Sequence, residues 1–202
     1  MAQLFSLGVL AFMLTAPSRI TADIRRMCRK IGGLDEPIFV DVSPRTDSGR
    51  DDCFMDVRRQ VEEHGGSIQH GWTIWEWPGI SAEGEFHAVW RKPDGQLLDV
   101  THKKDGESRI VFAPDPKRVF EERRVPNIRM AIGRNPRILR WIELNERYDR
   151  LVGRALQDVP FGTQVVIKGE AVDLRHQLDS LSLELAESRE SRRAAGASFP
   201  LL

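Results

Sequence analysis

The sequence predicts an α+β domain over residues 20–115, with a small antiparallel sheet, followed by helices. Apolar and polar residues alternate in short runs between residues 67 and 113, as they do in half-buried strands. Apolar residues recur at helical spacing within residues 53–64 and again beyond Pro116. A chain of 202 residues, 41% hydrophobic and 30% charged, has the size and composition of one globular domain with a helical extension.

Composition and charge exclude several classes of protein. The two cysteines, Cys28 and Cys53, are too few for a disulfide framework or for a zinc site of four cysteines. The formal net charge is zero, which gives no general attraction to nucleic acid or to anionic lipid. No run approaches the ~20 apolar residues that span a bilayer. We therefore expect neither a membrane nor nucleic acid among the partners.

Residues 1–19 form a poorly defined N-terminal segment. Residues 4–14 are apolar enough for the core of a signal peptide, but no lysine or arginine precedes them. A true start at Met13 would explain the same stretch equally well. The missing positive region favours a cytoplasmic chain, and secretion through a weak signal is the alternative.

The remaining elements follow from periodicity and from residues that stop helices. We expect helices over residues 21–31 and 53–64, the second of them ended by Gly65 and Gly66. Strands are expected over residues 38–42, 67–77, 83–92, 96–101 and 109–113. Residues 116–186 form the helical extension, with helices over 136–156, opened by Asn135 and Pro136, and over 170–186. Residues 187–202 are expected to be a flexible tail.

The turn Pro93-Asp94-Gly95 fixes the register of the hairpin around it. Its sequence suits a three-residue loop with glycine in the left-handed conformation. Trp90 then faces Leu98, which makes His87 and Asp99 diagonal neighbours on one face. The imidazole and the carboxylate are expected to meet, whereas a loop one residue longer would place them on opposite faces.

Cys53 stands where a loop becomes a helix. The first N–H groups of a helix are unpaired and the helix dipole is positive there, which favours the nucleophilic thiolate. A helix-start cysteine, a strand histidine and an acidic residue on the next strand are the parts of a Cys-His-Asp triad. Cys53 would be the nucleophile, His87 the general acid and base, and Asp99 the carboxylate that orients the imidazole. No cofactor or metal is required for this chemistry. Cys28, inside the first helix, is expected to be structural.

The triad residues stand in three short motifs: Asp-Cys-Phe at 52–54, His-Ala-Val-Trp at 87–90 and Leu-Leu-Asp-Val-Thr at 97–101. Their order resembles the papain-like superfamily of cysteine hydrolases, and most closely its transglutaminase-like branch, over residues 46–113. The resemblance implies a papain-like core. It also implies a thiol hydrolase (a peptidase or amidase) or an acyltransferase that acts on amide or isopeptide bonds of a peptide or protein.

Two features depart from that pattern. Asp51 and Asp52 precede the cysteine where transglutaminase-like sequences usually carry glycine, and their charge opposes a thiolate. No side chain is an obvious oxyanion donor, so the candidates are the N–H of Cys53, Gln69 or a tryptophan N–H. The alternative is a non-enzymatic binding module on a degenerate papain-like fold, with a Trp-rich hairpin and a basic helix that hold a protein or nucleic-acid partner.

The hairpin residues supply the candidate substrate contacts. Trp75 and Trp77 share one face of their strand and, with Gln69 and Glu85, could line a cleft for an extended substrate. Core packing of the tryptophans is the other interpretation. Arginines recur every seven residues along the helix over 136–156, either as a solvated face or as a docking surface. The leucines of the helix over 170–186 suit either packing within the chain or a homodimer.

Overall fold

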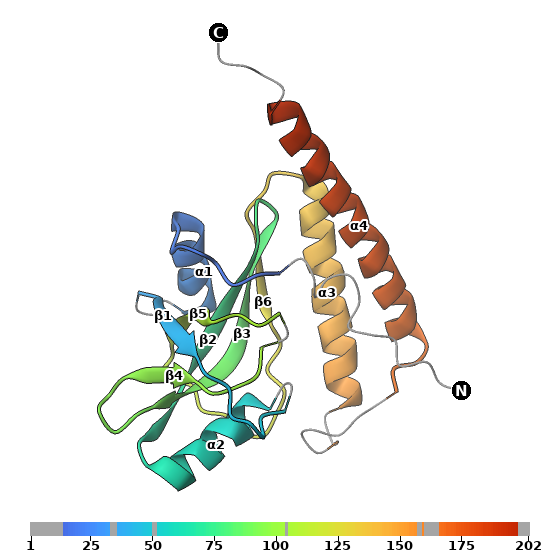
Figure 1. Ribbon diagram of the computed structural model, residues 1–202. Coiled ribbons are helices and arrows are strands. Elements are labelled where there is room, and N and C mark those ends of the chain that lie inside the picture. Colours follow the sequence, from blue (N-terminus) through green and yellow to red (C-terminus); the bar gives the residue numbers. More distant parts are fainter. Residues whose placement is uncertain are drawn as a thin grey trace.

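The computed structural model describes residues 14–32, 36–49, 52–103, 105–156, 159 and 166–197, of which 189–197 are described as backbone only. Helices and strands over this part of the chain confirm the α+β class, and a mixed, barrel-like sheet forms its centre (Figure 1). The sheet is built from the strands β1 (Ile38–Val42), β2 (Ser67–Trp77), β3 (Ser81–Arg91), β4 (Leu97–Asp99), β5 (Arg109–Pro114) and β6 (Ile128–Ala131).

The sheet closes on itself because β2 pairs on both sides. The strand order is β2-β5-β1-β4-β3-β6, and β2 also pairs with β3 along its whole length. Among the strand pairs of the described residues, β1 and β4 are the only parallel pair. The other edge of β3 is shared between β6, at residues 81–84, and β4, at Trp90 and Arg91. Close packing inside the curl requires glycine at position 71, where a Cβ would lie 2.4 Å from the ring of Phe112.

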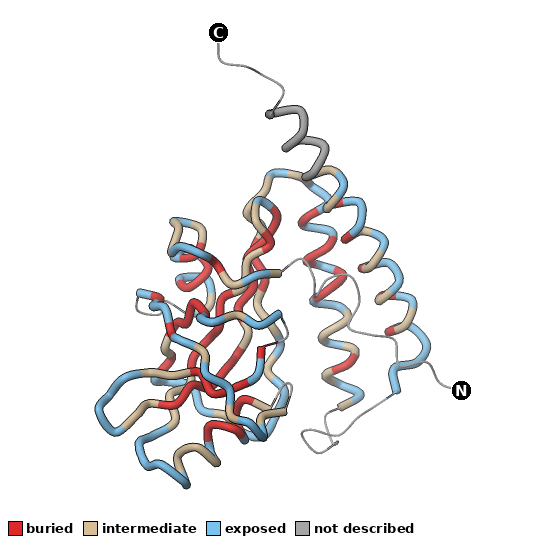
Figure 2. The backbone as a smooth tube through the Cα atoms, in the orientation of Figure 1, coloured by how far each residue is buried: buried red, intermediate tan, exposed pale blue. Residues whose placement is uncertain are grey.

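Two helices cover the outer face of this sheet. Helix α1 (Ala22–Gly32) and helix α2 (Cys53–His64) bury their apolar residues against it. The resulting core contains Cys28, as expected, and alternate residues of β3: Ala82, Phe86, Ala88 and Trp90. A separate cluster around Val40, Val89 and Phe112 fills the opposite face, which the curled sheet encloses. Figure 2 shows the buried residues concentrated along the strands and the inward faces of the helices.

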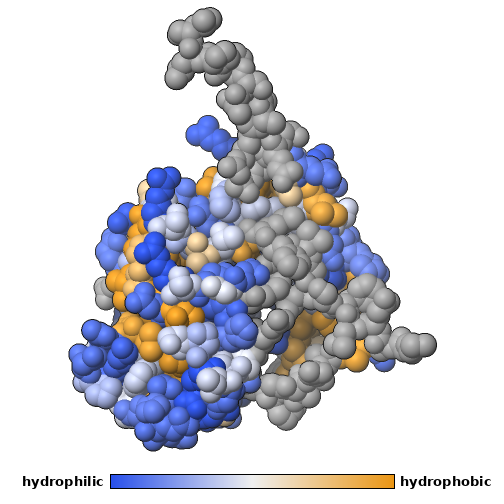
Figure 3. Space-filling model, viewed as in Figure 1, coloured by the Kyte–Doolittle hydropathy of each residue, from blue (hydrophilic) through white to orange (hydrophobic). Residues whose placement is uncertain are grey.

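A helical hairpin packs against one side of the sheet. Helices α3 (Pro136–Ala155) and α4 (Glu170–Ala197) run side by side (Figure 1), and Asn135 caps α3 by accepting a hydrogen bond from the N–H of Arg137, as the sequence predicts. Between them and the β2–β3 turn lies a second core that includes Trp77, Trp141 and the leucines of α4. The view in Figure 3 shows apolar surface over the sheet, where β1 exposes Ile38 and Phe39.

Three expectations about the chain's organisation need correction. Residues 116–131 are not helical, and residues 128–131 instead form β6, which adds to the sheet beside β3. Helix α4 continues to Ala197, so the predicted tail from residue 187 is helical over most of its length. Part of the segment 1–19 is ordered, because Thr15 forms a two-bond bridge with Glu76. The signal-like stretch through Met13 lies outside the described residues.

Candidate functional site

The start of α2 is held in place by a chain of polar contacts. Asp56, one turn after Cys53, is fully buried and accepts hydrogen bonds from Ser48 at 2.6 Å and from Arg59 at 2.6 Å. The hydroxyl of Ser48 in turn accepts from the N–H of His102. These bonds join α2 to the loop before it and to the segment after β4. Cys53 itself is 7% exposed.

The hairpin register is as the sequence predicts. Trp90 pairs with Leu98, and Gly95 closes the three-residue turn by donating its N–H to the carbonyl of Lys92. His87 and Asp99 meet as expected, with Nε2 of the imidazole 2.8 Å from Oδ2 of the carboxylate. His87 is 4% exposed and Asp99 is fully buried. The carboxylate is oriented further by the N–H of Thr101, which donates to its other oxygen.

Cys53 is the first residue of α2, and its charge acts on the imidazole of His87. The body of α2 packs against the Ala88 side of β3, while His87 projects from the opposite side. Both described contacts of His87 use Nε2, so Nδ1 is the ring nitrogen left for the thiol. Within the described residues, Cys53 acts on His87 through its charge and not through a hydrogen bond.

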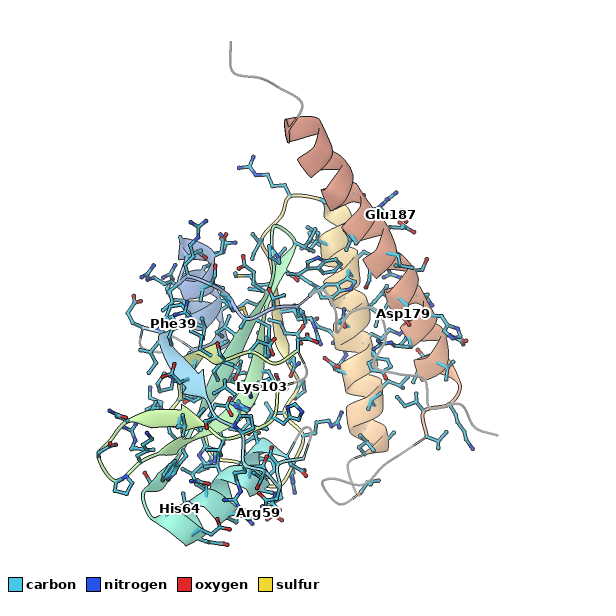
Figure 4. The ribbon with its side chains drawn as sticks, in the orientation of Figure 1. Phe39, Arg59, His64, Lys103, Asp179 and Glu187 are labelled. Atoms are coloured by element: carbon cyan, nitrogen blue, oxygen red, sulfur yellow. The ribbon has the colours of Figure 1, made fainter. Side chains whose placement is uncertain are left out.

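Lys103 is the member of the site that the sequence interpretation missed. Its ammonium lies 2.6 Å from Oδ2 of Asp99 and 3.2 Å from Nε2 of His87, and the residue is only 7% exposed. Figure 4 labels Lys103 over the sheet, away from the α3–α4 hairpin. The spacing of four residues between Asp99 and Lys103 is the one signal in the sequence that could have indicated the pair.

Burial and charge together set the protonation of this cluster. Burial and the Lys103 ammonium lower the pKa of His87. The negative charges of Asp99 and Cys53 raise it by more than that, so the pKa of His87 in the folded protein is about 9. Burial would raise the pKa of Asp99, yet His87 and Lys103 hold it well below its usual value. At neutral pH the site therefore holds an imidazolium against a carboxylate.

This protonation predicts a pH-dependent contribution of His87 to stability. The pKa of His87 is 6.5 in an ordinary environment and about 9 in the folded protein, so its contribution is complete below pH 6.5 and is lost as the pH rises through 9. Asp99 stays ionised throughout that range. We expect the destabilisation by His87→Gln to shrink by about 3 kcal/mol between pH 6 and pH 10. Urea unfolding of both proteins across this range measures it, and a constant difference would contradict an imidazolium in the native state.

The backbone at the helix start provides the remaining candidate for an oxyanion donor. The carbonyl of Asp52 accepts from the N–H groups of Met55 and Asp56, and the Asp52 side chain makes no capping bond. Among the described residues, nothing accepts a hydrogen bond from the N–H of Cys53. Asp51 lies outside the described residues. The N–H of Cys53, at the positive end of α2, is therefore available to an incoming oxygen.

The side chains that were expected to contact a substrate instead contact other residues of the chain. Trp77 is buried in the core beneath α3, with its ring 5.7 Å from that of Trp141, so it cannot line a cleft. Trp75 packs against the cluster inside the sheet and donates its ring N–H to Glu85 at 2.6 Å. Gln69 uses its amide N–H on the carbonyl of His70 and its amide oxygen on Arg91. The core interpretation of the tryptophans fits these positions.

The helical hairpin likewise satisfies its own polar and apolar groups. The arginine stripe of α3 is paired with glutamates, at Arg137–Glu184, Arg140–Glu143, Arg147–Glu170 and Arg150–Glu146. The buried leucines of α4, Leu174, Leu178 and Leu185, pack within the chain. Among the described residues of the hairpin, Leu139 on α3 and Leu183 on α4 are exposed.

No group of three or more histidine, cysteine or acidic side chains among the described residues could hold a metal ion. Cys28 and Cys53 are both free thiols. In the part of the chain that the structure covers, no helix is both long and apolar enough to cross a membrane. No family model, no curated protein and no solved structure matches the chain.

Proposed function

We propose that the protein is a cysteine-dependent hydrolase or acyltransferase that acts on amide or isopeptide bonds of a peptide or protein. The observation that carries the proposal is the buried hydrogen bond between His87 and Asp99, with Cys53 at the start of α2 close enough for its charge to act on the imidazole. Cys53 is the nucleophile, His87 the general acid and base, and Asp99 the orienting carboxylate.

The reaction uses the protein's own groups. The proton of the Cys53 thiol resides on the His87 imidazolium at Nδ1, and the Cys53 thiolate attacks the carbonyl carbon of the amide. The oxygen of the tetrahedral intermediate accepts a hydrogen bond from the N–H of Cys53. Collapse breaks the carbon–nitrogen bond and His87 gives its proton to the leaving amine. Water or a second amine then attacks the thioester, again through His87, and the thiol is regenerated.

Alkylation of Cys53 by iodoacetamide tests the Cys-His pair without a known substrate. At pH 7 the wild-type protein should be alkylated at Cys53, and His87→Ala should slow that reaction about ten-fold or more, because the imidazolium no longer favours the thiolate. Mass spectrometry of the modified peptides locates the reaction. Cys28, which is 1% exposed and whose pKa burial raises to about 11, serves as the internal unreactive thiol.

His64→Ala is the matched control, because His64 is an exposed histidine at the other end of α2. Its alkylation rate should equal that of the wild type. Equal rates in His87→Ala and wild type, with both proteins folded by circular dichroism, would refute the proposed pair and with it the proposed chemistry.

A further inference from the structure

The contact between Lys103 and His87 joins two groups that both donate. An ammonium can only donate, and Nε2 of His87 must carry a proton to bond the ionised Asp99. Oδ2 of Asp99 therefore accepts from both, at 2.6 Å from Nζ and 2.8 Å from Nε2. The 3.2 Å separation of Nζ from Nε2 is then a contact between two donors that share one oxygen.

Sharing the oxygen limits how strongly Asp99 can hold the histidine's proton. Asp99 and Lys103 already balance each other in charge, so the carboxylate is not fully available to a second cation. The ionisable groups that act on His87 come from three elements: Cys53 at the start of α2, Asp99 at the end of β4 and Lys103 four residues later. Of these, Lys103 is the one whose positive charge opposes the imidazolium.

We propose that Lys103 is a positioning residue that lowers the proton affinity of His87 and so keeps the imidazolium able to release its proton. The claim that the imidazolium must be able to release its proton rests on the proposed function, in which His87 protonates a leaving amine. A general acid works best when its pKa lies near the working pH, and Asp99 alone would bind the proton too tightly. The ammonium also holds Asp99 in place through a hydrogen bond of its own.

The titration of the His87 side chain tests the proposal directly. Protein labelled with ¹⁵N-histidine gives ring signals that distinguish imidazolium from imidazole, and His87→Gln identifies the signal of His87 among five histidines. We expect Lys103→Met to move the midpoint of His87 upward by roughly one to three pH units. At pH 10 the wild-type ring should be mostly neutral and the variant ring still mostly protonated.

Three further variants separate charge from packing. Lys103→Gln removes the charge but keeps hydrogen-bond donors, and it should shift the midpoint upward even if Lys103→Met does not fold. Lys103→Arg keeps the charge and should restore a midpoint near that of the wild type. Lys168→Met removes an exposed lysine that precedes α4 and should leave the midpoint unchanged.

An unchanged or lowered His87 midpoint in Lys103→Gln would overturn the proposal. The measurement does not depend on the thiol, because the same shift is expected in a Cys53→Ser background. If the shift appears while alkylation of Cys53 is indifferent to His87, the electrostatic role of Lys103 stands and the proposed enzymatic function fails. If alkylation of Cys53 depends on His87 but the shift of the His87 midpoint is absent, the proposed function stands and the role of Lys103 fails.

Discussion

Replacing Asp99 by asparagine is expected to lower the free energy of unfolding at pH 7 by about 3–5 kcal/mol. The substitution preserves the shape of a fully buried side chain but removes the only negative charge within hydrogen-bond distance of both His87 and Lys103 among the described residues. Breaking a buried ion pair from one side leaves an uncompensated charge, here the ammonium of Lys103. That penalty, and not the lost bond itself, supplies most of the effect.

Chemical denaturation of five proteins checks this expectation: the wild type, Asp99→Asn, Lys103→Met, the double variant and a control. The double variant Asp99→Asn with Lys103→Met should recover part of the loss, because it removes the stranded ammonium, and the double-mutant cycle measures the coupling. Asp105→Asn is the control, since Asp105 is exposed and follows the same strand by a few residues. A loss for Asp99→Asn no larger than that for Asp105→Asn would mean that the buried pair contributes little to the fold.

The sequence predicts those parts of the fold that depend on local pattern. Strand β2 and helix α2 have the expected bounds, because alternation, helical spacing and the glycines at 65 and 66 all act within a few residues. The contact of His87 with Asp99 is also predictable, since a three-residue turn transmits the register from one strand to the next. The sequence pattern was sufficient wherever a single turn, or the spacing of apolar residues within one element, determined the structure.

The rest depends on contacts between distant segments. Strand β6 has only four residues, and it is a strand because it pairs with β3, far away in the sequence. Trp77 continues the alternation of β2, but α3 covers it, and nothing near Trp77 in the sequence indicates that cover. Lys103 was missed because lysines are seldom buried unless they are paired. Its partner, Asp99, is itself buried, and that burial depends on the β3–β4 hairpin.

The second large expected effect is a loss of stability when the contacts that attach β6 and α3 to the sheet are broken. Arg129 on β6 is 7% exposed and binds Glu83 on β3 at 2.8 Å and Asp149 on α3 at 2.6 Å. Asn127 donates a further hydrogen bond to Glu83 at 2.6 Å. Burial raises the pKa of Glu83, and Arg129 and Asn127 offset only part of that rise. Arg129 is therefore the main positive charge that opposes the rise in the pKa of this buried glutamate.

We expect Arg129→Met to lower the free energy of unfolding by about 3–5 kcal/mol at pH 7, a large share of the 5–15 kcal/mol typical of a domain. Arg140→Met, which removes an arginine from an exposed ion pair on α3, should cost less than about 1 kcal/mol. Glu83→Gln in the Arg129→Met background should restore stability in part, because it removes the stranded carboxylate. The loss of stability in Arg129→Met should also diminish as the pH falls and Glu83 takes up a proton.

Hydrogen exchange tests whether Arg129 joins the two parts of the molecule. Because Arg129 touches both β3 and α3, exchange in this variant should speed up in β6 and α3 together. Faster exchange in β6 alone would show that Asp149 does not couple the α3–α4 hairpin to the sheet.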